Sequence, residues 1–158
     1  MHLRRINKKL KKALLILITL YLMIGATLYS LQERMLFMPT VLPQDYNYSF
    51  DNTFEELFLE SEDGAVLNAL HFKNSNPKGV ILYFHGNAGD LSRWGSIAEY
   101  FVELNYNVLI MDYRTYGKSI GELSEEAMYN DGQLCYDFLK ALYPENNIII
   151  YGRSLGSG

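Results

Sequence analysis

The stretch Ile148-Ile149-Ile150-Tyr151-Gly152-Arg153-Ser154-Leu155-Gly156 decides the fold class. Its first four residues are apolar and predict a short strand covered on both faces, as in a parallel sheet. The five residues after them have the pattern G-x-S-x-G, which is typical of a sharp turn from a strand into a helix with an exposed serine hydroxyl. Gly152 and Gly156 suit this turn because the backbone segments approach too closely for larger side chains. We therefore expect an α/β fold with Ser154 as candidate nucleophile.

Further strands are predicted upstream. Residues 79–84 and 108–111 are unbroken apolar runs, so each fits a buried strand of the same parallel sheet. Residues 53–60 and 65–73 are two short strand-like runs on either side of a turn at Asp63-Gly64, which predicts an antiparallel hairpin. A hairpin followed by strands that alternate with helices indicates an α/β class with right-handed crossovers.

Two amphipathic helices are predicted between these strands. Asp90 can cap the first helix, and Asn105 can take the left-handed conformation that ends it. Ser124 can cap the second, with two acidic residues in its first turn. The inward positions expected from the helical period are Trp94, Ile97, Ala98, Phe101 and Leu104 in the first, and Ala127, Leu134, Cys135, Phe138 and Leu142 in the second.

The N-terminal region has a different composition. Residues 1–12 contain six of the 14 basic residues, and residues 13–32 contain no charge and ten Leu or Ile. This length and composition predict a transmembrane signal-anchor helix over residues 13–32, with a cleaved secretory signal as the alternative. The positive residues place the tail on the cytoplasmic side and the rest of the chain on the outer side, whether periplasmic, extracellular or lumenal. We expect residues 33–50 to be an irregular connector and residues 51–158 to be the domain.

Composition excludes several classes of function. From Glu33 onward the chain has 8 basic and 18 acidic residues, which argues against nucleic-acid binding. The single cysteine, Cys135, cannot form an internal disulfide. His2, His71 and His85 have no zinc-ligand spacing, and no P-loop or G-x-G-x-x-G follows a strand. No metal and no organic cofactor are therefore expected.

A second candidate element follows the predicted strand 79–84. It is the glycine-rich loop His85-Gly86-Asn87-Ala88-Gly89-Asp90. In acyl transfer the carbonyl oxygen gains negative charge, and fixed backbone N–H groups stabilise it. A loop at this position can supply one donor, Asn87, while Leu155 directly after the serine supplies the other.

Three ordered motifs resemble the alpha/beta-hydrolase superfamily: Phe84 to Gly89, Asp112 to Ser119, and Gly152 to Gly156. They are most similar to its membrane-anchored group related to alpha/beta-hydrolase domain-containing protein 13. The resemblance implies that Ser154 is the nucleophile and that Asn87 and Leu155 form the oxyanion hole, with His85 and Gly86 in the oxyanion loop. It also implies hydrolysis of an ester, thioester or amide of a small acyl substrate. Thr115 stands where the family usually has glycine, which affects the expected shape of its loop.

The triad is the main departure from the family pattern. In this fold the acid and the base follow the nucleophile along the chain, and only four residues follow Ser154. His71 and His85 precede it, Asp112 is expected to organise its own loop, and strand 148–151 is expected at a sheet edge without a following helix. We therefore expect the N-terminal half of a membrane-anchored hydrolase, lacking the triad Asp and His and with little activity of its own. The alternatives are a non-catalytic binding module and an acyltransferase on the same elbow.

Overall fold

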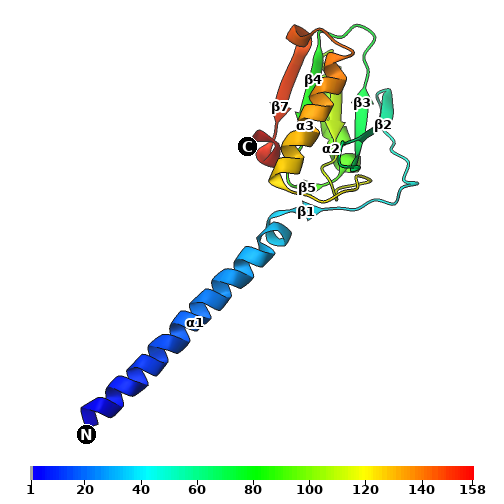
Figure 1. The fold of residues 1–158 in the computed structure, drawn as a ribbon. Coiled ribbons are helices and arrows are strands. Elements are labelled where there is room, and N and C mark those ends of the chain that lie inside the picture. The colour runs from blue at the N-terminus through cyan, green and yellow to red at the C-terminus, as the bar shows by residue number, and fades with distance from the viewer. Residues whose placement is uncertain (1) are drawn as a thin grey trace. The chain divides into compact units, whose positions relative to one another are not determined.

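The computed structural model describes residues 2–158, with side chains for residues 7–32 and 37–158. The chain divides into two compact units, Met1–Phe37 and Met38–Gly158. The first is a single helix, and the second is a sheet with helices packed on it (Figure 1).

The first unit consists of α1 (His2–Leu36). Its stretch Asn7–Gln32 is long and apolar enough to cross a membrane, lies near the N-terminus and has none of its residues buried. A signal sequence meets the same test of length and composition. The hydroxyls of Thr19 and Ser30 each donate to a carbonyl one turn earlier at 2.9 Å, so their polar groups are satisfied within the helix.

The predicted cytoplasmic tail, residues 1–12, falls partly outside the described residues. Met1 and the side chains of residues 2–6, including Arg4 and Arg5, lie outside them. The described side chains of residues 7–12 are all exposed.

Five strands form the main sheet of the second unit: β2 (Phe54–Glu60), β3 (Val66–Phe72), β4 (Val80–Phe84), β6 (Asn107–Met111) and β7 (Ile148–Gly152). Their order is β2-β3-β6-β4-β7. The β2–β3 and β3–β6 pairs are antiparallel, and β4 is parallel to both β6 and β7. The predicted hairpin and parallel strands are thus confirmed. β7 lies at an edge of the sheet, as expected, and Ile149 and Ile150 are 42% and 56% exposed.

Helices α2 (Leu91–Glu103) and α3 (Glu125–Lys140) connect these strands. Asp90 caps α2 by accepting from the N–H of Ser92, and Ser124 caps α3 by accepting from that of Ala127, as the sequence predicts. Asn105 has a φ of 69°, the expected left-handed stop after α2.

The two helices cover opposite faces of the sheet (Figure 1). Side chains alternate in direction along β4, so Tyr83 belongs to the core that includes α2, whereas Phe84 lies against Gly132 of α3. The inward face of α3 differs from the prediction in one respect. Leu142 is 56% exposed because α3 ends at Lys140, and Leu139 is fully buried instead.

Residues 38–50 belong to the compact second unit, although the sequence interpretation assigned them to a connector. Strand β1 (Met38–Pro39) pairs in parallel with β5 (Ala88–Gly89). Tyr48 is buried and donates its hydroxyl to Oδ1 of Asn68 at 2.8 Å. The sequence of this segment shows no hydrophobic periodicity, because the segment packs through individual aromatic side chains and backbone hydrogen bonds and not through one repeating apolar face.

His71 in β3 is a buried neutral histidine. The Tyr143 hydroxyl accepts from Nδ2 of Asn107 at 2.8 Å and forms a hydrogen bond of 2.9 Å with Nε2 of His71. Nδ1 of His71 has no partner among the described residues. Burial lowers the pKa of His71 to about 4.

This histidine makes the second unit sensitive to acid. The unfolded chain binds the proton near pH 6.5 and the folded chain only near pH 4, so the stability contributed by neutral His71 is lost as pH falls through this window. We expect a loss of about 2–3 kcal/mol at its acid end. Urea unfolding between about pH 7 and pH 4.5 should show a weaker pH dependence in His71→Gln than in the wild type. Equal slopes would assign the acid sensitivity to other groups.

Candidate active site

Ser154 lies two residues after Gly152, the last residue of β7. Its φ is 54°, in the left-handed region that residues with a side chain seldom adopt, and its side chain is exposed. It is the first residue of a short 3-10 helix, η2 (Ser154–Ser157). A strained backbone that presents a serine hydroxyl to solvent is the geometry of a nucleophile elbow.

The two glycines on either side of this serine lie where a side chain has no room. A Cβ on Gly152 would overlap the carbonyl oxygen of Gly156, and a Cβ on Gly156 would overlap the backbone of Phe84. The N–H of Arg153 donates to the carbonyl of Phe84 at 3.0 Å. The elbow is therefore fixed against the carboxyl end of β4.

The glycine-rich loop at residues 85–90 is next to this elbow. A Cβ on Gly86 would lie 3.6 Å from the carbonyl oxygen of Arg153 and 3.1 Å from the Trp94 ring. The loop that carries Asn87 and the turn that carries Leu155 are thus side by side, at the carboxyl ends of the parallel strands β4 and β7. Ligands of open α/β sheets bind at this edge.

Asn87 is held in place from two sides. The Tyr116 hydroxyl lies 2.7 Å from the carbonyl oxygen of Asn87 and 2.8 Å from its Oδ1, and it donates to these acceptors. The N–H of Met38 donates to the same Oδ1 at 3.3 Å. Burial raises the pKa of Tyr116 to about 12, so its hydroxyl keeps its proton at neutral pH. These contacts order the backbone of the glycine-rich loop at Asn87.

His85 is fully buried beneath the loop, with both ring nitrogens engaged. Nδ1 lies 2.7 Å from the carbonyl oxygen of Gly86, and Nε2 lies 3.1 Å from Oδ1 of Asp112. Asp112 also accepts from the N–H of Leu91 at 3.1 Å, and burial raises the pKa of its carboxyl despite the nearby imidazole. No ring nitrogen of His85 remains for Ser154, so the geometry supports a structural role.

In the loop after β6, Thr115 stands at the position where the sequence departs from the family pattern, and its backbone is in the left-handed region. Thr115 is exposed and has a φ of 72°. A β-branched residue is strained in this region, where glycine is not. The neighbouring Tyr113 and Tyr116 are buried and contact His85, so the loop is fixed by its aromatic residues.

Trp94 is a site residue that the sequence interpretation treated only as core. Its indole N–H donates to the carbonyl of Ala88 at 2.8 Å, and its ring stacks on that of His85 with centroids 5.5 Å apart. The sequence signal that could have revealed this role is the position of Trp94 in the first turn of the helix that follows the glycine-rich loop. Helical spacing alone could not reveal this contact, because the period predicts burial and not the partner.

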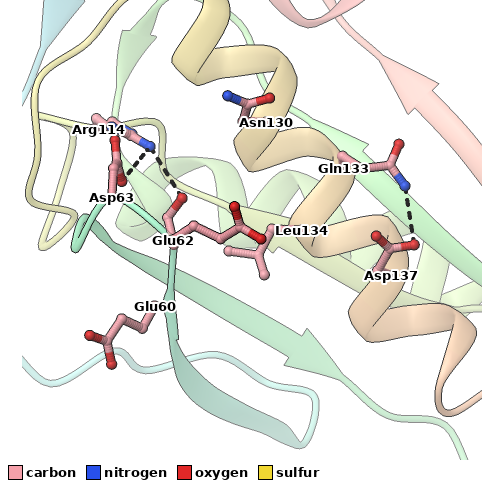
Figure 2. Close-up of a pocket in the computed structure, with 9 residues that line it drawn as sticks. Glu60, Glu62, Asp63, Arg114, Asn130, Gln133, Leu134 and Asp137 are labelled. Carbon is pink, nitrogen blue, oxygen red and sulfur yellow. Dashed lines mark hydrogen bonds and ion pairs between the residues drawn. The ribbon is translucent and has the colours of Figure 1, made fainter.

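Arg114, in the same loop as Thr115, is buried and joins three parts of the unit. It donates to Asp131 of α3 at 2.8 Å and to Asp63 of the β2–β3 turn. The pair of Arg114 and Asp63 borders a cavity of about 390 Å³ whose lining also includes Glu60, Glu62 and Asp137, and Figure 2 shows Arg114 bound to Asp63 there. Because its cation is paired with carboxylates, Arg114 adds no open charge to the elbow.

Within residues 2–158, as far as their side chains are described, no group of three or more His, Cys, Asp or Glu side chains could hold a metal ion. Cys135 is buried against Met111, and burial raises the pKa of its thiol.

A mixed sheet with a serine elbow after one of its parallel strands and a glycine-rich loop after the adjacent one defines the class of alpha/beta-hydrolases. The chain belongs to the serine aminopeptidase family S33, whose family model matches residues 75–158.

Characterised relatives extend this assignment. Protein bem46 of Schizosaccharomyces pombe is 32% identical over 141 residues, which are 82% of this chain and 47% of bem46. Lysophosphatidylserine lipase ABHD12 of Mus musculus is 31% identical over 137 residues, which are 73% of this chain and 34% of the lipase. The chain thus spans about half or less of the length of these relatives.

Solved structures show the same fold. The Pyrococcus furiosus esterase Pf2001 has a TM-score of 0.60 at 24% identity and covers 77% of this chain and 49% of its own. An alpha-beta hydrolase from Vibrio vulnificus has a TM-score of 0.57 at 27% identity and covers 65% of this chain and 36% of its own. The superfamily predicted from the three motifs is confirmed, while the narrower similarity to the group of alpha/beta-hydrolase domain-containing protein 13 stays a prediction.

Proposed function

We propose that this protein is a membrane-anchored serine hydrolase that cleaves ester bonds through an acyl-enzyme on Ser154. The observation that carries the proposal is the exposed Ser154 at a φ of 54°, next to the loop of Asn87. Such an elbow projects a hydroxyl toward a bound carbonyl.

The proposed reaction has two steps. Oγ of Ser154 attacks the ester carbonyl, its proton passes to a general base, and the alcohol leaves with a proton. Water then attacks the acyl-enzyme and releases the acid. The backbone N–H groups of Asn87 and Leu155 are proposed to stabilise the oxyanion in both steps.

The general base and its acid are proposed to come from residues other than those described. His85 has no open ring nitrogen, and His71 lies in β3 with its Nε2 bonded to Tyr143. Among the described residues, the proposal assigns a nucleophile and oxyanion donors but no base. Because loss of a triad base leaves only residual catalysis, we expect low activity from the described residues by themselves.

Lipid or small esters are the proposed substrates. One relative is named a lysophosphatidylserine lipase and one structural neighbour an esterase. The test is whether Ser154→Ala abolishes hydrolysis of p-nitrophenyl butyrate by the full-length gene product. Retained turnover would remove Ser154 from the mechanism.

We further propose that α1 anchors the protein with residues 1–12 on the cytoplasmic side, since its basic residues precede an uncharged stretch that could span the bilayer. In sealed membranes whose cytoplasmic side faces the added protease, a tag at residue 1 should then be digested and the second unit should be protected. Digestion of the second unit in these sealed membranes would reverse the orientation. Absence of α1 from the mature protein would indicate a cleaved signal.

A further inference from the structure

A short segment at the start of the second unit, residues 38–42, binds the glycine-rich loop of the candidate site. We call this segment the strap. Its strand β1 pairs in parallel with β5, which belongs to the loop at residues 85–90 (Figure 1). The N–H of Thr40 also donates to the carbonyl of Gly89 at 3.3 Å. The strap therefore adds a strand to the loop that carries Asn87.

The strap also binds the loop after β6. The N–H of Gly117 donates to the carbonyl of Thr40 at 2.8 Å, and the N–H of Leu42 donates to the carbonyl of Gly117 at 2.8 Å. Tyr116, next to Gly117, donates its hydroxyl to the carbonyl oxygen of Asn87 at 2.7 Å. The strap, the glycine-rich loop and the loop after β6 are thus three segments, each of which is hydrogen-bonded to the other two.

The strap is held by its backbone more than by its side chains. The side chains of residues 38–41 are exposed, with Met38 57% and Val41 72% exposed. Leu42 packs in part against the core. Because burial of apolar surface is the main stabilising term in folding, a segment with exposed side chains adds little to the core. Its main contribution is the order that its hydrogen bonds impose on the two loops.

The glycine-rich loop depends on such contacts for its order. Gly89 has a φ of 97°, and glycine loses more conformational freedom on folding than any other residue. Trp94 holds the loop at Ala88. Tyr116 holds it at Asn87, and the strap holds it at both Asn87 and Gly89. An oxyanion donor stabilises the transition state best when it is already in place as the charge develops, so the order of this loop matters for catalysis.

We propose that the strap and Tyr116 are positioning elements of the oxyanion hole, which hold the backbone N–H of Asn87 where the developing oxyanion needs it. This rests on the proposed function. Neither element touches the reacting atoms, and both act through the glycine-rich loop. Loosening either one lowers kcat and leaves KM nearly unchanged, because the oxyanion forms in the transition state and not in the bound ester.

The role of Tyr116 is tested by Tyr116→Phe in the full-length gene product. The variant keeps the buried ring and loses the hydroxyl that holds Asn87. The kcat for p-nitrophenyl butyrate should fall by about 10-fold, with KM changed by less than about 2-fold. Tyr48→Phe is the matched control, because it also removes a buried hydroxyl that donates to an asparagine, Asn68. It should lower the free energy of unfolding similarly and retain the wild-type kcat.

The strap itself is tested by Thr40→Pro. Proline removes the N–H that donates to Gly89 and puts a ring carbon in place of the hydrogen, so the strap must move away from β5. We expect kcat to fall by about 10-fold, again with KM changed by less than about 2-fold. Thr40→Ala is the matched control, because it alters only an exposed side chain and keeps every backbone bond. It should retain the wild-type kcat.

Hydrogen exchange of the backbone amides in residues 85–90 measures the order of the loop without any catalysis. Exchange should be about 10-fold faster in Tyr116→Phe and Thr40→Pro than in the wild type. The two control variants should exchange at the wild-type rate in these residues.

Exchange and kcat in Tyr116→Phe equal to those in Tyr48→Phe would overturn the positioning role and leave Ser154 as nucleophile. Faster exchange with unchanged kcat would overturn it too, since catalysis would then not depend on the order of this loop. If the wild type hydrolysed no ester while Tyr116→Phe and Thr40→Pro still exchanged faster, the proposed function would be contradicted. The strap would then still order the glycine-rich loop, but not for ester hydrolysis.

Discussion

Ser154→Ala is expected to lower the kcat of the full-length gene product for p-nitrophenyl butyrate by about 10⁴-fold or more. The substitution removes the only atom that can form the acyl-enzyme in the proposed mechanism. It leaves the backbone N–H groups of Asn87 and Leu155, so the remaining rate should still exceed that of the uncatalysed reaction.

The alanine variant should fold, because the Ser154 side chain is exposed. The φ of 54° is already adopted by serine, which has a Cβ, so alanine at this position adds no new backbone strain. Ser96→Ala, at an exposed serine of α2, is the control and should retain wild-type turnover. A Ser154→Ala variant within 10-fold of the wild type, about 1.4 kcal/mol in activation free energy, would place the nucleophile elsewhere.

The features that the sequence predicts well are local ones. The caps Asp90 and Ser124 and the left-handed Asn105 follow from interactions within a few residues. The strands follow from runs of apolar residues whose burial requires no knowledge of a particular partner. The close approach of the backbone at Gly152 to that at Gly156 was also predictable, because it depends only on the spacing within the five residues 152–156.

What could not be predicted depends on contacts between distant residues. Arg114 reaches Asp63 and Asp131, and nothing in the spacing of these residues indicates that they meet. Tyr116 reaches Asn87 in the same way. The sequence placed the glycine-rich loop after its strand, but the aromatic and ionic contacts that hold this loop arise only when β4, β6 and α2 are assembled.

Gly156→Ala is expected to destabilise the second unit by about 2–4 kcal/mol, more than most single substitutions. Gly156 does not have a positive φ, so the effect is purely steric. The added methyl group would overlap the backbone of Phe84, which cannot rotate away as a flexible side chain could. The elbow would have to move away from β4, breaking the bond from Arg153 to Phe84.

Gly132→Ala in α3 provides the matched comparison. Its Cβ would lie 3.4 Å from the Phe84 ring, an ordinary contact, and alanine favours a helix interior by up to about 1 kcal/mol over glycine. In thermal melts followed by circular dichroism, Gly156→Ala should melt about 10 °C below the wild type, and Gly132→Ala at or above it. If both variants melted together with the wild type and Gly156→Ala kept its esterase activity, the elbow would not be packed against β4. Ser154 would then lack the rigid support on which its proposed role depends.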